Sequence, residues 1–365
     1  MSAPTPRPGI LDISPYVGGE SKLAGVDRII KLSSNEGALG PSPRAVAAFQ
    51  AMAGQMHRYP DGHAVQLRAA LARQFGLDAA RIVCGNGSDE LLQLLARCYA
   101  GPGDEVLYSR HAFIVYPIAA LSAGATPVAA DEVDLTASVD HLLAKVTPRT
   151  RVVFLTNPNN PTGTYLPAAE VKRLRDGLPA DVLLVIDAAY AEYVERNDYS
   201  NGAELVEAGE NTVMTRTFSK IYGLGGMRVG WAYCPAQVAD VLNRTRGPFN
   251  ISNAGLAAAQ AALEDVAFTD LARRHNSFWR AWLAERLSAL GLLVVPGVAN
   301  FLLVRFPHQA GRTAKEADAF LRGKGIIVRQ VASYGLPDFL RITIGRDDET
   351  QAVASALSEF MEAQG

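Results

Sequence analysis

The sequence contains few cysteines and no long apolar run. Only three of its 365 residues are cysteines, Cys84, Cys98 and Cys234, and they form no CxxC pair. This excludes a disulfide framework, and a reducing, cytoplasmic setting fits best. No segment approaches the ~20 consecutive apolar residues of a membrane helix, and residues 1–9 lack the apolar core of a secretory signal. The sequence therefore predicts neither a membrane span nor export.

The sequence also lacks an excess of either charge. Lys and Arg number 35 against 37 Asp and Glu, which gives a formal net charge of −2. Without a basic excess, neither nucleic acid nor an anionic membrane is an expected partner. There are no internal repeats or low-complexity tracts, and nothing in the pattern predicts a metal site. The length of the chain favours more than one domain.

Apolar segments alternate with helical patterns from about residue 81 onward. Residues 150–155 and 182–186 are almost wholly apolar, which is typical of strands buried on both faces. The alternation predicts an α/β domain with a mostly parallel sheet covered by helices on both faces. Ligands bind such sheets at the carboxyl ends of the strands. The distinctive loops of this chain all follow a predicted strand.

The chain divides into three parts that differ in composition and in hydrophobic periodicity. Residues 1–30 are rich in Pro and Gly and have no clear periodicity, so they predict an N-terminal arm. Residues 31–245 carry the alternating pattern and predict a large cofactor-binding domain. Residues 246–365 mix helices and short strands, and predict a smaller α+β domain.

The most informative loop follows a short apolar run at 212–214. It carries Lys220, and a partly desolvated lysine can form a Schiff base with a carbonyl group. Thr217, Ser219 and Arg228 offer two hydroxyls and a guanidinium, a suitable set for a phosphate. The alternative is a glycine-rich surface turn with an ordinary solvated lysine and arginine.

Other loops add candidate ligand groups. The loop at 85–89 opens a predicted helix, whose N-terminal N–H groups can bind an anion. Asp187 ends an apolar strand, where a carboxylate is costly without a cationic partner, and Tyr190 follows three residues later. Each has a plain alternative: an N-cap by Ser88 or Asp89 in the first loop, and a cap on the following helix by Asp187. For Asn160, in Asn-Pro-Thr-Gly, the alternative is turn chemistry.

Taken together, these motifs resemble the fold-type I pyridoxal-phosphate aminotransferases. They are NNPTG at 159–163, Asp187-x-x-Tyr190, Ser219-Lys220 and Arg228, in that order after successive strands. The resemblance is strongest to the histidinol-phosphate aminotransferases. It rests there on KLSSNE at 31–36, RYPDG at 58–62, GNGSDE at 85–90 and GIIVRQVASYGLPDFLRITIG at 325–345. It covers nearly the whole chain and implies pyridoxal 5′-phosphate as the cofactor.

The resemblance implies a role for each cofactor-site residue. Lys220 would bind the cofactor covalently and then carry a proton between the substrate α-carbon and the cofactor C4′. Asp187 would pair with the pyridinium nitrogen, and Tyr190 would hydrogen-bond the phenolic oxygen. The remaining cofactor-binding residues would be Asn160 at the phenolic oxygen, Phe113 stacked on the ring, and at the phosphate Ser88, Asp89, Thr217, Ser219, Arg228 and, from the second subunit of a homodimer, Tyr59.

The resemblance also implies a substrate site. Arg341 would bind the carboxylate of the amino-acid substrate, a bidentate task that suits a guanidinium. Arg329 and Tyr16 are assigned to the distal end of the amine substrate, and Asn35 is assigned to the substrate site. The chain departs from the family pattern at Gly37-Ala38 and at Gly18-Gly19, and both departures are expected near the substrate entrance. They bear on substrate choice and leave the chemistry unchanged.

The implied reaction is a ping-pong transamination between an amine donor and a 2-oxo acid acceptor, by a cytoplasmic homodimer. The implied pair is histidinol phosphate with 2-oxoglutarate, in histidine biosynthesis. One alternative is an aromatic-amino-acid aminotransferase, which would lack phosphate recognition near Arg329 and Tyr16. A second is a threonine-phosphate decarboxylase, which would release carbon dioxide. A third is a binding or regulatory module that kept the fold and lost catalysis, and it would show no absorbance from a bound cofactor.

Overall fold

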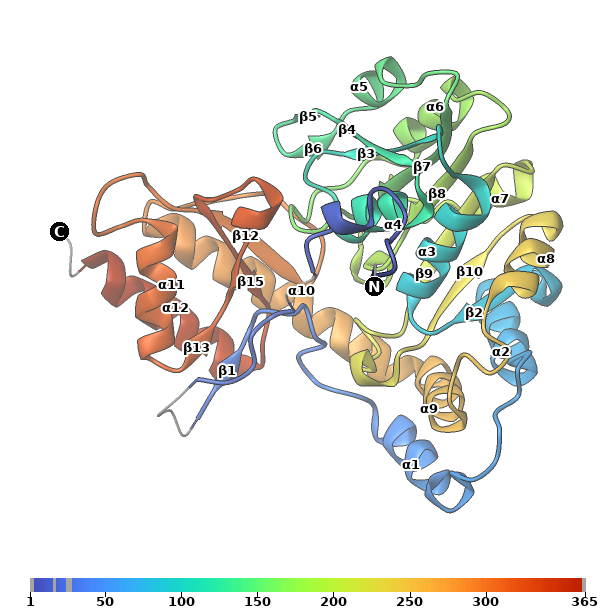
Figure 1. Cartoon of the computed structure of the whole chain (residues 1–365). Helices are drawn as coiled ribbons and strands as arrows, with labels where there is room; N and C mark the ends of the chain where they lie inside the picture. Colours follow the sequence, from blue (N-terminus) through green and yellow to red (C-terminus); the bar gives the residue numbers. More distant parts are fainter. Residues whose placement is uncertain (1–2, 16–17, 24–27, 363–365) are drawn as a thin grey trace.

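The computed structural model describes residues 3–15, 18–23 and 28–362. Its larger body is built on a seven-stranded sheet in the order β2-β10-β9-β8-β7-β3-β4 (Figure 1). The strands are β2 (Ile82–Gly85), β3 (Glu105–Ser109), β4 (Thr126–Ala130), β7 (Thr150–Thr156), β8 (Leu183–Asp187), β9 (Thr212–Thr217) and β10 (Gly230–Tyr233). Strand β10 runs antiparallel to β9 and β2, and the other pairs are parallel. The predicted mostly parallel α/β sheet is confirmed.

Helices cover both faces of this sheet. Successive strand side chains point to opposite faces, so Leu183 and Val185 pack against one set of helices, and Leu184 and Ile186 pack against another. The first face is covered by α3 (Ser88–Tyr99), α4 (Val115–Ala123) and α8 (Ala236–Thr245). The opposite face is covered by α5 (Val139–Ala144), α6 (Ala168–Gly177), α7 (Ala203–Ala208), α2 (Val65–Phe75) and α9 (Asn253–Glu264). Burial on both faces explains the unbroken apolar runs of the central strands.

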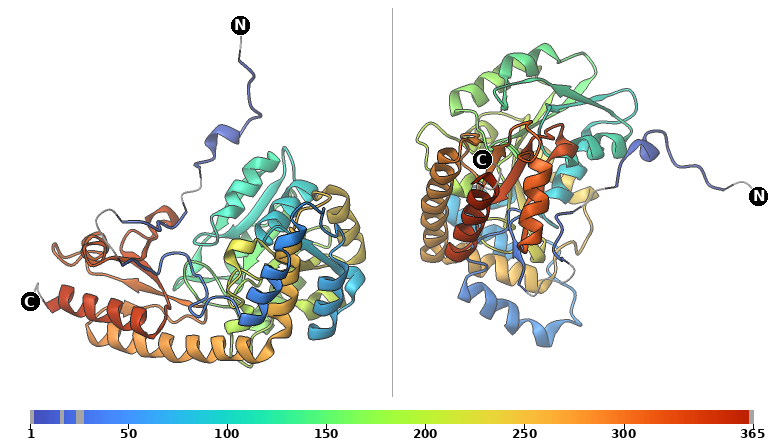
Figure 2. Two further views of the ribbon diagram at one scale, coloured as in Figure 1. Left: turned by 90° about the horizontal axis from the view of Figure 1, so that it is seen from below. Right: turned by 90° about the vertical axis from the view of Figure 1, so that its left-hand side faces the viewer.

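A second, four-stranded antiparallel sheet lies in the C-terminal part, in the order β11-β12-β15-β14. Its strands are β11 (Leu293–Val294), β12 (Phe301–Arg305), β15 (Phe339–Thr343) and β14 (Arg329–Gln330). Three helices share an apolar core with it: α10 (Val266–Ala289), α11 (Ala314–Gly323) and α12 (Asp347–Glu362). Figure 2 shows α10 running along one side of both bodies. Among the described residues, no helix is both long and apolar enough to cross a bilayer.

Two features connect the bodies. Strand β1 (Ile30–Lys31) pairs in parallel with β13 (Ile326–Ile327), so the chain leaving the arm first joins the C-terminal part. Helix α9 lies beyond residue 245, yet it packs in the same core as α1 (Pro43–Ala51) and α2. The carboxyl ends of β2, β3, β7, β8 and β9 meet at one edge of the large sheet, and the next residues from these ends form the candidate site.

Candidate active site

A cleft at this sheet edge brings the predicted residues together. Of the predicted site residues that the structure describes, all except Tyr59 line it. They are Asn35, Ser88, Asp89, Phe113, Asn160, Asp187, Tyr190, Thr217, Ser219, Lys220, Arg228, Arg329 and Arg341. Tyr59 is 82% exposed and stacks on Phe249 at a ring distance of 4.8 Å, away from the cleft. Tyr16 lies outside the described residues.

The lysine loop is held by close backbone contact. The Lys220 Nζ donates to the carbonyl of Ser34 at 3.5 Å and lies 5.7 Å from the ring centre of Tyr190. At Gly223 (φ 67°), a Cβ atom would lie 2.2 Å from the carbonyl oxygen of Gly40, so only glycine lets the two segments approach this closely. The half-buried lysine therefore has a fixed backbone and one long side chain reaching into the cleft.

The two family departures lie in different places. Gly37 packs against the lysine loop, where a Cβ would be 2.7 Å from the Lys220 carbonyl oxygen. It therefore contacts the backbone that carries the lysine, and its expected place near the substrate entrance stays a prediction. Gly19, by contrast, lines the cleft.

Asp187 places a buried carboxylate on the cleft. Its oxygens accept from the hydroxyls of Tyr116 at 2.9 Å and Thr215 at 3.3 Å, both neutral donors. Burial raises the pKa of Asp187 to about 6, because the charged form is desolvated. Such a site is suited to the cationic nitrogen of a ligand. The alternative of a helix cap is wrong, because the next helical turn begins only at Ala191.

An anion cradle lies beside it, at the N-terminus of α3. Gly87 is the N-cap, with φ 77° and no side-chain cap, so capping by Ser88 or Asp89 is wrong. At Gly230 a Cβ would lie 2.3 Å from the Ser88 nitrogen, so β10 can approach the helix end this closely only because residue 230 is a glycine. Ser88 and Asp89, the first two residues of this helix, line the cleft, which suits the helix end to an anion.

Arg228 completes the cradle. Its guanidinium donates to the Ser219 hydroxyl and to the Asp89 carboxylate, each at 3.2 Å. The Thr217 hydroxyl donates to Ser219 at 3.0 Å, so the three side chains form one connected group. A guanidinium, hydroxyls and a helix N-terminus together suit a phosphate.

The opposite wall joins the two bodies. Arg341, on β15, is buried and donates to the amide oxygen of Asn160 at 2.5 Å and to the Ser33 carbonyl at 2.8 Å. Asn35 donates to the Tyr190 hydroxyl at 2.9 Å. Burial raises the pKa of Tyr190 to about 12, so this hydroxyl keeps its proton and can donate it in a hydrogen bond. A buried guanidinium held by neutral acceptors is suited to an anionic substrate group.

Several residues of the site went unnoticed in the sequence. Tyr116 and Thr215 hold Asp187, and Ser33, Ser34 and Tyr334 line the cleft. Two of them had a signal: Tyr116 lies three residues after Phe113 at the start of a helix, and Thr215 lies two residues before Thr217 on a strand. Ser33, Ser34 and Tyr334 lie within the motifs at 31–36 and 325–345, but no role was assigned to them, because the pairing of distant segments brings them to the cleft.

The chain was compared with known proteins. A profile described as "Aminotransferase class I and II" matches residues 27–357. The chain is 66% identical over 363 residues to the histidinol-phosphate aminotransferase of Paramagnetospirillum magneticum, with 100% of both covered. It is 63% identical over 362 residues to that of Rhodospirillum rubrum, covering 99% of this chain and 98% of the relative.

Solved structures agree with this result. The histidinol-phosphate aminotransferase from Sinorhizobium meliloti, in complex with pyridoxal-5′-phosphate, matches with a TM-score of 0.90 and 29% identity over 100% of both chains. A histidinol-phosphate aminotransferase from Clostridium acetobutylicum, at 21% identity, has the same fold with a TM-score of 0.83 and covers 91% of this chain and 99% of that one.

Proposed function

The chain belongs to the class I and II aminotransferases and, within them, to the histidinol-phosphate aminotransferases, and from this premise we propose that it transfers the amino group of histidinol phosphate to 2-oxoglutarate. The family resemblance found in the sequence is confirmed, and the proposed reaction is a step of histidine biosynthesis. The observation that carries the proposal is the cleft. A lysine, a buried carboxylate, an anion cradle and an arginine from the second sheet all face it.

The enzyme uses pyridoxal 5′-phosphate, and the cleft residues fit it. Asp187 offers a buried negative charge for the pyridinium nitrogen, and the cradle of Arg228, Ser219 and the α3 N-terminus is suited to the phosphate. Phe113 and Asn160 would face the ring. When bound, the cofactor withdraws electrons from the substrate α-carbon, which makes the proton on that carbon removable.

Lys220 is assigned to move that proton. Its Nζ is half-buried, lies on the cleft and is held near the Ser34 carbonyl, and a positioned amine of this kind can act as a general base. Tyr190 keeps its hydroxyl proton and, through Asn35, has a fixed orientation. Asp187 supplies a negative charge next to the pyridinium nitrogen of the bound cofactor.

Substrate binding is assigned to the C-terminal sheet. Arg341 would bind the carboxylate of glutamate and 2-oxoglutarate with both guanidinium nitrogens. Histidinol phosphate has no α-carboxylate, so its recognition must come from its phosphate end. Arg329, on β14, and Tyr334 line the same cleft, and Arg329 is assigned to this phosphate together with Tyr16.

The proposed assembly is a cytoplasmic homodimer. Tyr59 lies outside its own cleft, which leaves it available to the phosphate site of a second subunit. Exposed apolar side chains lie on α1, on α2 and against Tyr59 itself: Phe49 is 43% exposed, Val65 is 58% exposed and Phe249 is 49% exposed. Such side chains are suited to a subunit interface. The division into residues 1–30, 31–245 and 246–365 stays a prediction.

The deciding experiment compares two amine donors. With 2-oxoglutarate as acceptor, we expect kcat/KM for histidinol phosphate to exceed that for phenylalanine by about 100-fold or more, which is ~2.7 kcal/mol of transition-state binding. Equal or reversed values would overturn the proposal in favour of an aromatic aminotransferase. Release of carbon dioxide from threonine phosphate would instead identify a decarboxylase.

A variant of the cradle tests how the cofactor is held. Arg228→Gln removes a charged donor, and charged hydrogen bonds contribute about 1.5–3 kcal/mol. We therefore expect the cofactor dissociation constant to rise roughly 10- to 100-fold. Arg244→Gln is the control, because Arg244 is exposed on α8 and pairs with Asp240 of the same helix. Wild-type cofactor affinity in Arg228→Gln, measured by absorbance titration, would contradict the assignment.

A further inference from the structure

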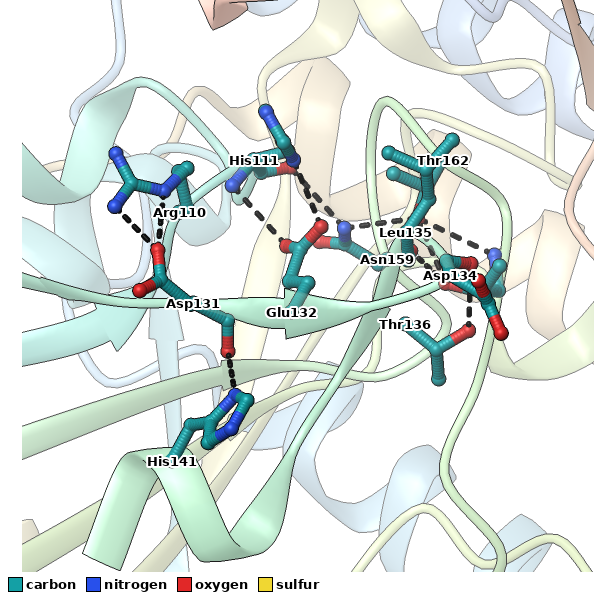
Figure 3. Close-up of polar contacts among 11 residues, drawn as sticks. Arg110, His111, Asp131, Glu132, Asp134, Leu135, Thr136, His141, Asn159 and Thr162 are labelled. Atoms are coloured by element: carbon teal, nitrogen blue, oxygen red, sulfur yellow. Dashed lines mark hydrogen bonds and ion pairs between the residues drawn. The ribbon is translucent and has the colours of Figure 1, made fainter. Parts of the chain in front are cut away.

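A polar network outside the cleft connects a small hairpin to two of the cleft walls (Figure 3). The hairpin consists of β5 (Glu132–Val133) and β6 (Thr136–Ala137), which pair antiparallel. At one end it contacts the loop between β3 and α4, and at the other it contacts the loop after β7. Neither contact is part of the strand pairing of the large sheet.

The central contact is between Glu132 and His111. One Glu132 oxygen accepts from the His111 backbone N–H at 3.1 Å, and the other lies 2.8 Å from the ring Nδ1. The carboxylate requires a donor there, so Nδ1 carries a proton. The Glu132 side chain is only 3% exposed and that of His111 is 15% exposed. A buried carboxylate is costly without donors, and here one residue supplies two. Glu132 therefore fixes both the backbone and the ring of His111.

His111 in turn touches the first cleft wall through the chain itself. Phe113, which lines the cleft, is two residues further on, before α4 begins. The turn that contains His111 is closed by a hydrogen bond from the Ala112 N–H to the Ser109 carbonyl, directly before Phe113. A shift of His111 therefore moves the residue proposed to stack on the cofactor ring.

The second wall is reached through Asn159. Its side-chain amide donates to the His111 carbonyl at 3.1 Å and to the Thr162 hydroxyl at 2.9 Å. The next residue is Asn160, whose side chain accepts from Arg341. The hairpin tip supports the same loop, because the Thr164 hydroxyl donates to the Leu135 carbonyl at 2.9 Å.

The ring of His111 also reaches the second body. A Cβ built on Gly335 would lie 3.7 Å from the His111 Nε2, which is ordinary van der Waals distance. Gly335 follows Tyr334, which lines the cleft, and Leu135 at the hairpin tip packs beside the apolar cluster of the C-terminal sheet. One histidine therefore lies next to three segments that supply cleft residues.

We propose that His111, clamped by Glu132, is a positioning residue. It holds Phe113 and Asn159–Asn160 in the positions in which they bind the cofactor and substrate. The proposal rests on the proposed function, since it concerns the same cleft. Displacement of a reacting group by about 1 Å can cost ~100-fold in rate, so a clamp on two walls has a measurable effect on turnover. It acts through other residues, and it does not itself belong to the lining of the cleft.

The neighbouring residues offer a matched control. Arg110 and Asp131 precede His111 and Glu132 by one position each and form the corresponding ion pair, but their side chains are 54% and 57% exposed. We expect Glu132→Gln to lower kcat/KM roughly 10- to 100-fold and to change the visible circular dichroism of the bound cofactor, which reports how the ring is held. We expect Asp131→Asn to stay within about twofold of the wild type in both measurements, because exposed ion pairs contribute little.

A second pair of variants separates positioning from folding. His111→Asn keeps an N–H donor near the place of Nδ1, whereas His111→Ala keeps none. We expect the asparagine variant to recover about tenfold of the activity that the alanine variant loses, with the cofactor dichroism restored in parallel. Thermal unfolding shows which variants fold, and if Glu132→Gln does not, the two His111 variants decide.

Three results would overturn the clamp: Glu132→Gln matching Asp131→Asn, His111→Asn no better than His111→Ala, or lost activity with unchanged cofactor dichroism. Failure of the substrate proposal would look different. The wild type would then not use histidinol phosphate, while the dichroism, measured without substrate, would still compare the variants.

Discussion

Replacing Lys220 with alanine is expected to lower kcat by about 10⁴-fold or more. Removal of a general base alone costs up to about 10⁴-fold, and this variant also loses the covalent attachment of the cofactor. The structure places the Nζ next to the Ser34 carbonyl and near Tyr190, on the cleft that also holds Asp187. Single-turnover mixing with glutamate, followed by cofactor absorbance, measures the chemical step directly.

Two controls make this result specific. Lys172→Ala should be unchanged, because Lys172 is exposed on α6 and pairs with Asp176 within its helix. Added methylamine should restore part of the rate in Lys220→Ala, since a small amine can enter the space left by the side chain and accept the proton. Activity within tenfold of the wild type in Lys220→Ala would show that another group moves the proton.

Replacing Asp187 with asparagine is expected to have opposite effects on activity and on the stability of the cofactor-free protein. The activity effect follows from losing the charge that pairs with the cofactor ring, and removal of one preorganised electrostatic group costs about 10²–10³-fold in kcat. Steady-state assays at saturating cofactor measure this loss. Unchanged activity would show that the ring charge is not needed.

The stability effect follows from the raised pKa. Burial raises the pKa of Asp187 from 3.8 to about 6, so the folded cofactor-free protein holds this proton more tightly than the unfolded chain does. The contribution of this group to stability is therefore fully present below pH 3.8 and is lost as the pH rises through about 6. At 1.36 kcal/mol for each pKa unit, the loss is about 3 kcal/mol. Asparagine cannot ionise, so the Asp187→Asn variant does not lose this stability as the pH rises.

Urea denaturation of the cofactor-free proteins tests this prediction. At pH 8 we expect Asp187→Asn to be more stable than the wild type by up to about 3 kcal/mol, with the difference shrinking as the pH approaches 4. Saturating cofactor should remove this advantage, because its pyridinium nitrogen compensates the wild-type charge. A variant that is less stable at pH 8 would show that the carboxylate is already well compensated without the cofactor.

The sequence revealed the sheet because burial leaves a strong pattern. Residues 182–186 are apolar at every position, as a strand covered on both faces must be, and Asp187 stands out at its end. Strand direction leaves no such mark: β10 pairs antiparallel on both sides, yet it is buried along its length like the parallel strands of the sheet. The extent of the larger core was equally hidden, because α9 packs with α1 through contacts between distant segments.

Site residues could be predicted where the side chain itself has a chemical role. They could not be predicted where the role depends on which distant segment of the chain lies beside them. Lys220, Asp187 and Arg228 belong to motifs, and the structure brings them to one cleft. The contact of Lys220 with the Ser34 carbonyl and the clamp of Glu132 on His111 exist because distant segments of backbone lie side by side. A carbonyl group has no sequence signal, and an isolated Glu and His twenty-one positions apart do not predict a contact.

The bonds of the strap at residues 33–35 also govern the order in which the protein can be built. The Ser33 carbonyl accepts from Arg341 and the Asn35 N–H donates to Thr343, in each case across 308 positions of the chain. During synthesis, the strap therefore leaves the ribosome long before its partners exist, and contacts at such separation form late. A nascent chain shorter than 343 residues can complete much of the large sheet yet cannot close the cleft. Binding of a substrate carboxylate, which is assigned to Arg341, is consequently an event of the finished polypeptide.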